Sequence, residues 1–118
     1  MPKNEEVSLS SLGMQMPYNM QAEQSVLGAA LMDETILNRL ITDMEPEMFY
    51  SDQNRAVYET MRTLYTDSEA VDVITLVNAL AAGDTFASAD DVKVYITRIA
   101  ETVPAISNVD SYFKIVKE

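Results

Sequence analysis

Apolar residues recur at the spacing of one helix face along most of the chain, and this periodicity constrains the fold more than any other feature. The clearest segment runs from Asn19 to Leu31, with Asn19 as the expected N-cap. Glu23 falls in an early turn of this helix, where a negative charge suits the helix dipole. Gly28 lies mid-helix at a cost of about 1 kcal/mol relative to alanine, which predicts that another backbone packs very close there. The apolar stripe consists of Val26, Leu27, Ala30 and Leu31.

Two further helices are predicted after this one. Asp33 is the expected cap of a second helix that ends near Asp43, ahead of a Glu-Pro pair that avoids the α region. The apolar run at residues 48–50 then forms a knot that we expect to plug the core. Ser51, or the residue after it, caps a third helix that reaches about Tyr65.

Three more helices complete the periodic pattern. Asp72 caps a fourth helix, and Gly83 stands at the position expected for a left-handed stop. Ser88 with Asp91 resembles a capping box at the start of a fifth helix, which a proline later breaks. The sixth helix is expected over about residues 106–118.

The sequence therefore predicts an all-α fold, a compact orthogonal bundle of about six helices joined by short loops. The length of 118 residues fits a single domain. Residues 1–16 show no clean period and are expected to form a flexible arm, which leaves residues 17–118 as the helical domain. The predicted structural core is Val26, Leu27, Gly28, Leu31, Leu40, Phe49, Val57, Met61, Leu76, Leu80, Ile96 and Ile99.

The composition argues against catalysis by this chain. It contains no Cys and no His, which removes the usual zinc sites, thiolate chemistry and a histidine base. The three glycines are far apart, so no phosphate-binding loop is present. Pairs of carboxylates occur only at expected caps, turns and the arm, where solvated charge explains them. We expect no enzyme activity, metal or cofactor in this chain.

Charge indicates the kind of partner. Nineteen acidic residues against eight basic ones give a net charge of −11, and the basic residues form no block. Direct binding to DNA or to an anionic membrane is therefore not expected. A protein partner with a basic face is favoured, although the charge could equally serve only as a soluble acidic surface. No signal peptide and no apolar run of about 18 residues is found, so the cytoplasm is the expected location.

Several motifs together resemble one protein family. Residues 17–31, PYNMQAEQSVLGAAL, are similar to the pattern P-x-N-x-x-A-E-x-x-V-L-G-x-x-L that opens the N-terminal domain of DnaB-type replicative DNA helicases. Residues 49–50 resemble the family's F-Y, residues 71–76 its V-D-x-x-T-L, and residues 103–118 its V-P-x-x-x-N-x-x-x-Y-x-x-I-V-x-E. The chain departs from the family at Asn54, where a histidine is usual, and at residues 88–90, where a glycine pair is common.

This resemblance implies a function that the residues alone do not supply. A DnaB-type head would form part of the N-terminal collar of a hexameric ring and would dock the helicase-binding domain of primase, with helicase loaders as further partners. The chain ends where the family continues into a helical hairpin and a motor domain, so ATP and Mg²⁺ would be bound by the parent chain, and the isolated head would be a monomer or weak dimer. A stand-alone adaptor, such as a primase helicase-binding domain, is the alternative. The expected partner contacts are Arg39, Asp43, Glu59, Arg62 and Asn78.

Overall fold

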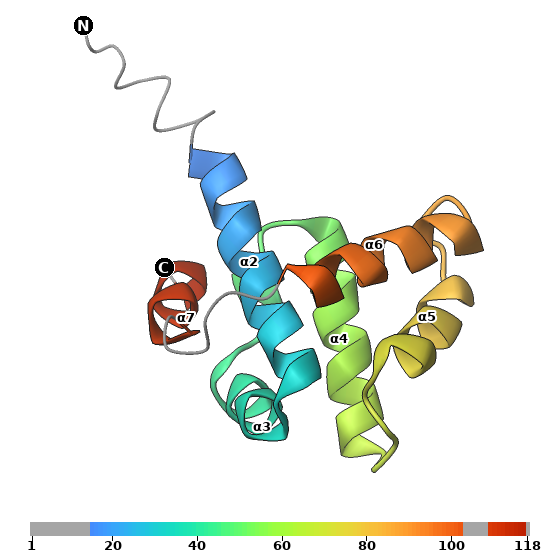
Figure 1. The fold of residues 1–118 in the computed structure, drawn as a ribbon, viewed down its shortest axis with the longest axis horizontal. Coiled ribbons are helices and arrows are strands. Elements are labelled where there is room, and N and C mark those ends of the chain that lie inside the picture. The colour runs from blue at the N-terminus through green and yellow to red at the C-terminus, as the bar shows by residue number, and fades with distance from the viewer. Residues whose placement is uncertain (1–14, 103–108, 118) are drawn as a thin grey trace, which may run out of the picture.

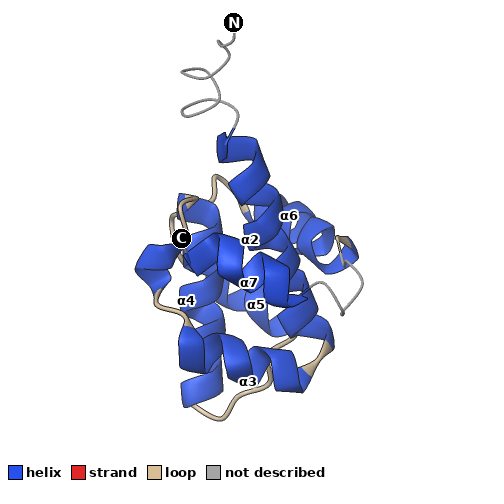
Figure 2. Ribbon diagram, turned by 90° about the vertical axis from the view of Figure 1, so that its left-hand side faces the viewer, coloured by secondary structure: helices blue, strands red, loops and turns tan. Residues whose placement is uncertain are grey.

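The computed structural model describes residues 15–102 and 109–117, and their regular structure is entirely helical (Figure 2). A short 3₁₀ turn at Pro46–Met48 lies between the second and third of the α-helices. The predicted all-α class and bundle of about six helices are confirmed. The α-helices are α2 (Gln15–Met32), α3 (Glu34–Asp43), α4 (Asp52–Thr66), α5 (Val73–Ala81), α6 (Ala89–Glu101) and α7 (Val109–Lys117).

Helix α2 is the centre of the bundle. It packs against α3, α4, α6 and α7, whereas α5 packs only against α4 and α6 among the main helix contacts. In Figure 1, α6 runs crosswise to α4, and α7 and α5 lie at opposite sides of the molecule. The turned view in Figure 2 agrees, with α7 in front and α5 behind. The helix predicted to organise the fold therefore has that place.

Helix α2 begins earlier than the sequence predicts. It starts at Gln15, so Asn19 lies inside the helix and is not its N-cap, and Glu23 is not in an early turn. Pro17 permits this start because it is the third residue of the helix, where the missing N–H would have no intrahelical partner. Of the expected arm, residues 1–14 lie outside the described residues and the last two belong to α2.

The predicted caps of the next three helices form. The side chain of Asp33 accepts a hydrogen bond from the backbone N–H two residues later at 2.8 Å, at the start of α3. Ser51 caps α4 through a 3.2 Å bond from the backbone N–H of Asn54. Asp72 and Thr75 form a reciprocal capping box at the start of α5. Each of these caps depends only on neighbouring residues, which explains why the sequence predicts them.

Two expected helix ends differ from the structure. Gly83 is not in the left-handed region, because α5 ends through Ala82 in a right-handed conformation that needs no glycine. Ser88 does cap α6, accepting from the backbone N–H of Asp91 at 3.1 Å. The last helix, α7, is shorter than expected, and the earlier part of its predicted range lies outside the described residues.

The left-handed stop occurs instead at the end of α4, on a serine. Ser68 has a φ of 61°, the only positive φ at a non-glycine residue in the described chain. The backbone N–H of Glu69 donates to the Leu64 carbonyl at 2.8 Å, and that of Ser68 donates to Tyr65 at 3.1 Å. These two bonds are the Schellman pattern. The sequence gives no warning of it, because no glycine marks the turn.

The core surrounds α2, and almost all of its predicted members lie in it. Leu31 is the exception, since it is half-buried near the end of α2. The expected apolar knot is also only partly inside: Phe49 is fully buried, but Tyr50 is 59% exposed. Phe49 stacks on Tyr58 with ring centroids 5.1 Å apart. The Tyr58 hydroxyl donates to the carbonyl of Met44 at 2.6 Å and so ties α4 to the end of α3.

Candidate functional site

The most polar point inside the bundle is Glu23, whose carboxylate is only 2% exposed. It accepts hydrogen bonds from the backbone N–H groups of Tyr50 at 2.7 Å and Ser51 at 3.3 Å, and from the side-chain amide of Asn54 at 2.9 Å. All three donors belong to the first turn of α4 or the residues just before it. The carboxylate therefore sits at the positive end of the α4 dipole rather than that of its own helix.

Helix α6 joins this network through Tyr95. Its hydroxyl donates to the side-chain oxygen of Asn54 and accepts from the side-chain amide of Gln24 at 3.3 Å. Burial raises the pKa of the Tyr95 hydroxyl above its ordinary value, and the nearby negative charge of Glu23 raises it further. The ring of Tyr95 also packs against Phe86 at a centroid distance of 5.3 Å. One polar cluster thus connects α2, α4 and α6.

This cluster is built to hold helices together, not to carry out a reaction. Both oxygens of Glu23 already accept hydrogen bonds, and the side chain has almost no exposed surface for a substrate to reach. A buried carboxylate satisfied by three donors stays ionised and fixes its donors in place. The sequence identifies Glu23 as a charge at a helix start, but the helix that it serves is a different one.

Gly28 marks the closest approach between α2 and α6. An ideal Cβ at this position would lie 2.5 Å from the carbonyl oxygen of Ile99. Real Cβ contacts of this kind are not observed at such a distance, so only glycine lets the two backbones meet here. The predicted reason for a mid-helix glycine, a neighbouring backbone, is what the structure contains.

Two of the expected partner contacts, Arg39 and Asp43, lie together on α3. Arg39 forms an ion pair with Asp43 at 3.8 Å and another, short one with Asp110 of α7. Its guanidinium also lies 4.4 Å from the ring centroid of Phe113. The Arg39 side chain, 43% exposed, therefore spends much of its binding capacity on fastening α7 to α3.

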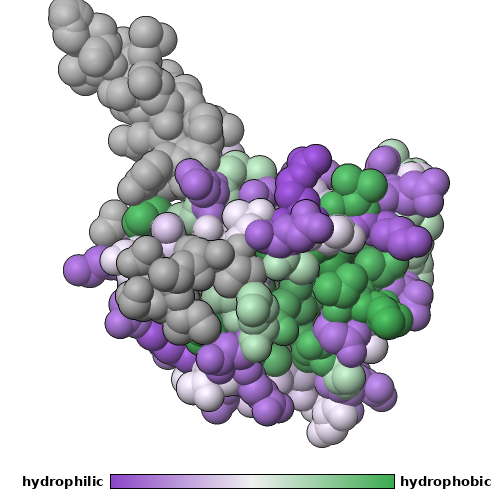
Figure 3. All heavy atoms as spheres, in the orientation of Figure 1, coloured by the Kyte–Doolittle hydropathy of each residue, from purple (hydrophilic) through white to green (hydrophobic). Residues whose placement is uncertain are grey.

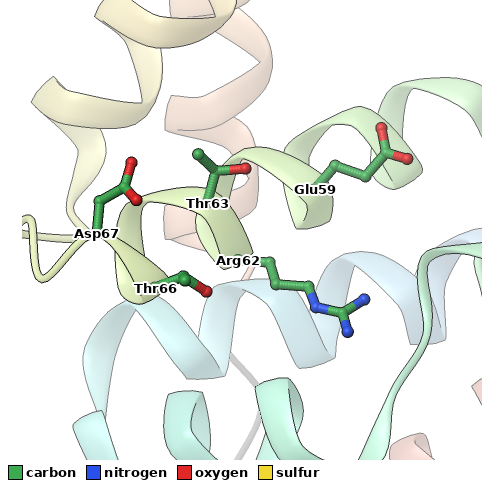
Figure 4. A pocket seen from close by; sticks show the side chains of 5 residues that line it. All are labelled: Glu59, Arg62, Thr63, Thr66 and Asp67. Carbon is green, nitrogen blue, oxygen red and sulfur yellow. The ribbon is translucent and has the colours of Figure 1, made fainter.

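Two more, Glu59 and Arg62, lie on the outer face of α4. With Thr63, Thr66 and Asp67 they line a shallow depression, and Figure 4 shows that Arg62 extends away from Asp67. Arg62 forms an ion pair with Glu45 at 3.3 Å. The depression is formed by one helix and its end, so it has no second wall that could enclose a small substrate.

The fifth expected contact, Asn78, is exposed on α5. The structure therefore brings the five residues together as one pair on α3, one pair on α4 and a single residue on α5. Their role in partner binding stays a prediction. Among the described residues, no group of three or more acidic side chains is placed to hold a metal ion, and no helix is long and apolar enough to cross a membrane.

Comparison with known protein families decides the identity of this fold. The model of the DnaB-like helicase N terminal domain matches residues 15–118. This chain belongs to that family. The resemblance inferred from the sequence motifs is thereby confirmed, and the matched range includes all of the described helices.

Individual relatives agree with this assignment. The chain is 34% identical over 102 residues to the replicative DNA helicase DnaC of Bacillus subtilis (strain 168), which covers 86% of this chain and 22% of that protein. It is 32% identical to the replicative DNA helicase DnaB of Geobacillus stearothermophilus, with the same coverage. The chain thus spans only about a fifth of the length of these helicases.

A solved structure shows the same fold. The crystal structure of the N-terminal domain of DnaB helicase from Mycobacterium tuberculosis matches with a TM-score of 0.71 and 28% sequence identity. The match covers 83% of this chain and 69% of that one. The fold and the family therefore rest on independent comparisons of sequence and structure.

Proposed function

We propose that this domain is a non-catalytic head of a replicative helicase ring, where it helps to build the N-terminal collar and docks primase or a helicase loader. The observation that carries this proposal is the family match over residues 15–118. DNA unwinding with ATP is assigned to the rest of the parent protein, which lies outside this chain.

The distribution of polar groups supports a role in binding. The buried polar side chains, Glu23, Ser25 and Asn54, lie inside the bundle, and two of them hold helices to one another. What the domain offers to other molecules is therefore its exterior. With a net charge of −11, that exterior favours protein partners with basic surfaces over nucleic acid.

Binding to primase is the direct test. Isothermal titration calorimetry would measure the affinity of the cognate primase C-terminal domain for this chain and for the complete helicase. The double variant Glu59→Ala with Arg62→Ala removes one charge of each sign from the α4 surface, and it should weaken binding by about tenfold. Lys93→Ala with Glu101→Ala is the matched control, because it removes the same charges from the exposed face of α6.

Two results would contradict the proposal in different ways. If neither this chain nor the complete helicase binds the primase domain, docking is not a function of the head. If binding occurs but the α4 and α6 variants behave alike, the head docks primase through other residues. Sedimentation of the isolated chain should show a monomer or a weak dimer.

A further inference from the structure

Helix α5 exposes an uncharged surface on a strongly charged domain. None of its nine residues is charged, although the chain carries 27 charged residues, 19 acidic and 8 basic. Leu76 and Leu80 face the core, whereas Ile74 is 71% exposed. Figure 3 shows hydrophobic side chains gathered over α5 and toward α4. We call the outer surface of this helix the α5 face, formed by Val73, Ile74, Val77, Asn78 and Ala81.

The residues around the α5 face are acidic, and none is basic. Residues 63–92 contain no Lys or Arg. Glu69 and Asp72 precede α5, and Asp84 follows it, all three exposed. Within the described parts of the chain, none of these carboxylates forms an ion pair, because the nearest arginines along the sequence pair with Glu45 and Asp52.

We infer that the α5 face docks a partner protein whose contact surface carries apolar side chains flanked by Lys or Arg. The apolar centre supplies buried area, and the acidic ends select basic residues at the rim. A second copy of this chain does not fit, because Glu69, Asp72 and Asp84 would meet their own like charges. Nucleic acid and anionic lipid are excluded by the same charges.

The size of the α5 face sets the strength of this contact. A nine-residue helix is about 13 Å long, which is less than the extent of an interface that buries about 800 Å² per partner. Docking here should therefore be weak alone, with a dissociation constant of the order of 100 µM, and should weaken further as salt screens the rim. This inference rests on the proposed function only in treating the domain as a docking head.

A synthetic peptide provides a defined probe. It is a helix of about 18 residues with Leu on one face and Lys on both flanks, titrated into the ¹⁵N-labelled chain and followed by NMR chemical shifts. The largest shifts should fall on residues 69–84. Ile74→Ser should weaken binding by about tenfold. Val94→Ser is the matched control, because Val94 is also apolar and 57% exposed but lies on α6, and its affinity should stay unchanged.

A second pair of variants tests the acidic rim. Glu69→Gln with Asp84→Asn should reduce the salt dependence of binding, whereas Glu47→Gln with Glu101→Gln removes as much charge elsewhere and should reduce it less. The inference is overturned if Ile74→Ser binds like the wild type, if the shifts lie outside residues 69–84, if a peptide with Ser in place of Leu binds equally well, or if the α5 face dimerises instead. The peptide contains no replication protein, so failure of primase binding leaves this result standing.

Discussion

Replacing Gly28 with alanine tests the packing at the centre of the domain. The new Cβ would lie 2.5 Å from the carbonyl oxygen of Ile99, whereas ordinary contact begins at 3.4 Å. Helices α2 and α6 must therefore separate by about 0.9 Å in a core that is otherwise close-packed. Both partners are helix backbone, so neither can move aside as a flexible side chain would.

The magnitude follows from two opposing effects. Alanine gains about 1 kcal/mol over glycine in helix propensity. Overpacking a core costs about 1 to 3 kcal/mol, and the upper value applies because the obstacle at Ile99 is backbone. The net loss of unfolding free energy is about 2 kcal/mol, which lowers the Tm by about 8 °C in a domain of this size. Gly28→Leu should lower the Tm further.

Thermal unfolding followed by circular dichroism measures this effect, and Gly83→Ala is the matched control. At Gly83 an added Cβ would lie 3.6 Å from the carbonyl oxygen of Leu80, an ordinary contact, and the backbone φ is not positive. That variant should keep the wild-type Tm or gain slightly from reduced unfolded-state entropy. A Tm for Gly28→Ala at or above that of the wild type would refute the close approach of the two helices.

Three other predictions follow from local features. Ser68→Gly should raise the unfolding free energy by about 1 kcal/mol in urea titrations, because glycine adopts the left-handed conformation without steric cost; a decrease would contradict this. Glu23→Gln should lower it by about 2 kcal/mol, since an amide NH₂ would face one of the three donors that the carboxylate now satisfies; wild-type stability would show that the charge is dispensable. Burial raises the pKa of the Tyr58 and Tyr95 hydroxyls above 10.0, so the folded state holds these protons more tightly. Stability should therefore be complete below pH 10 and fall as the pH rises above it, and the double Tyr→Phe variant should lose this alkaline dependence.

The sequence predicts the features that depend on neighbouring residues. Asp33, Ser51 and Asp72 each cap the helix expected of them, because a cap needs only a side-chain oxygen and an N–H two or three residues later. The helical period likewise predicts the core positions on α4 and α6. The start of α2 was wrong because Pro17 was interpreted as the entry to the fold, although proline is compatible with a first helical turn.

Contacts between distant residues could not be predicted in this way. The partners of Glu23 lie 27 to 31 positions later in the chain, and no periodicity connects them. The left-handed turn at Ser68 carries no glycine, so composition gives no signal for it. Arg39 was expected on a partner surface because charge on a helix exterior suggests exposure, whereas its contacts with Asp110 and Phe113 appear only when α7 is placed.

The arrangement of α5 and α7 has a consequence for assembly. These two helices lie at opposite sides of the domain, with α2 and α4 between them (Figure 1). A molecule seated on α5 therefore does not compete for space with one that contacts α7. The head is a two-sided connector: it can be held in a larger assembly by one side while the other recruits and releases a visitor.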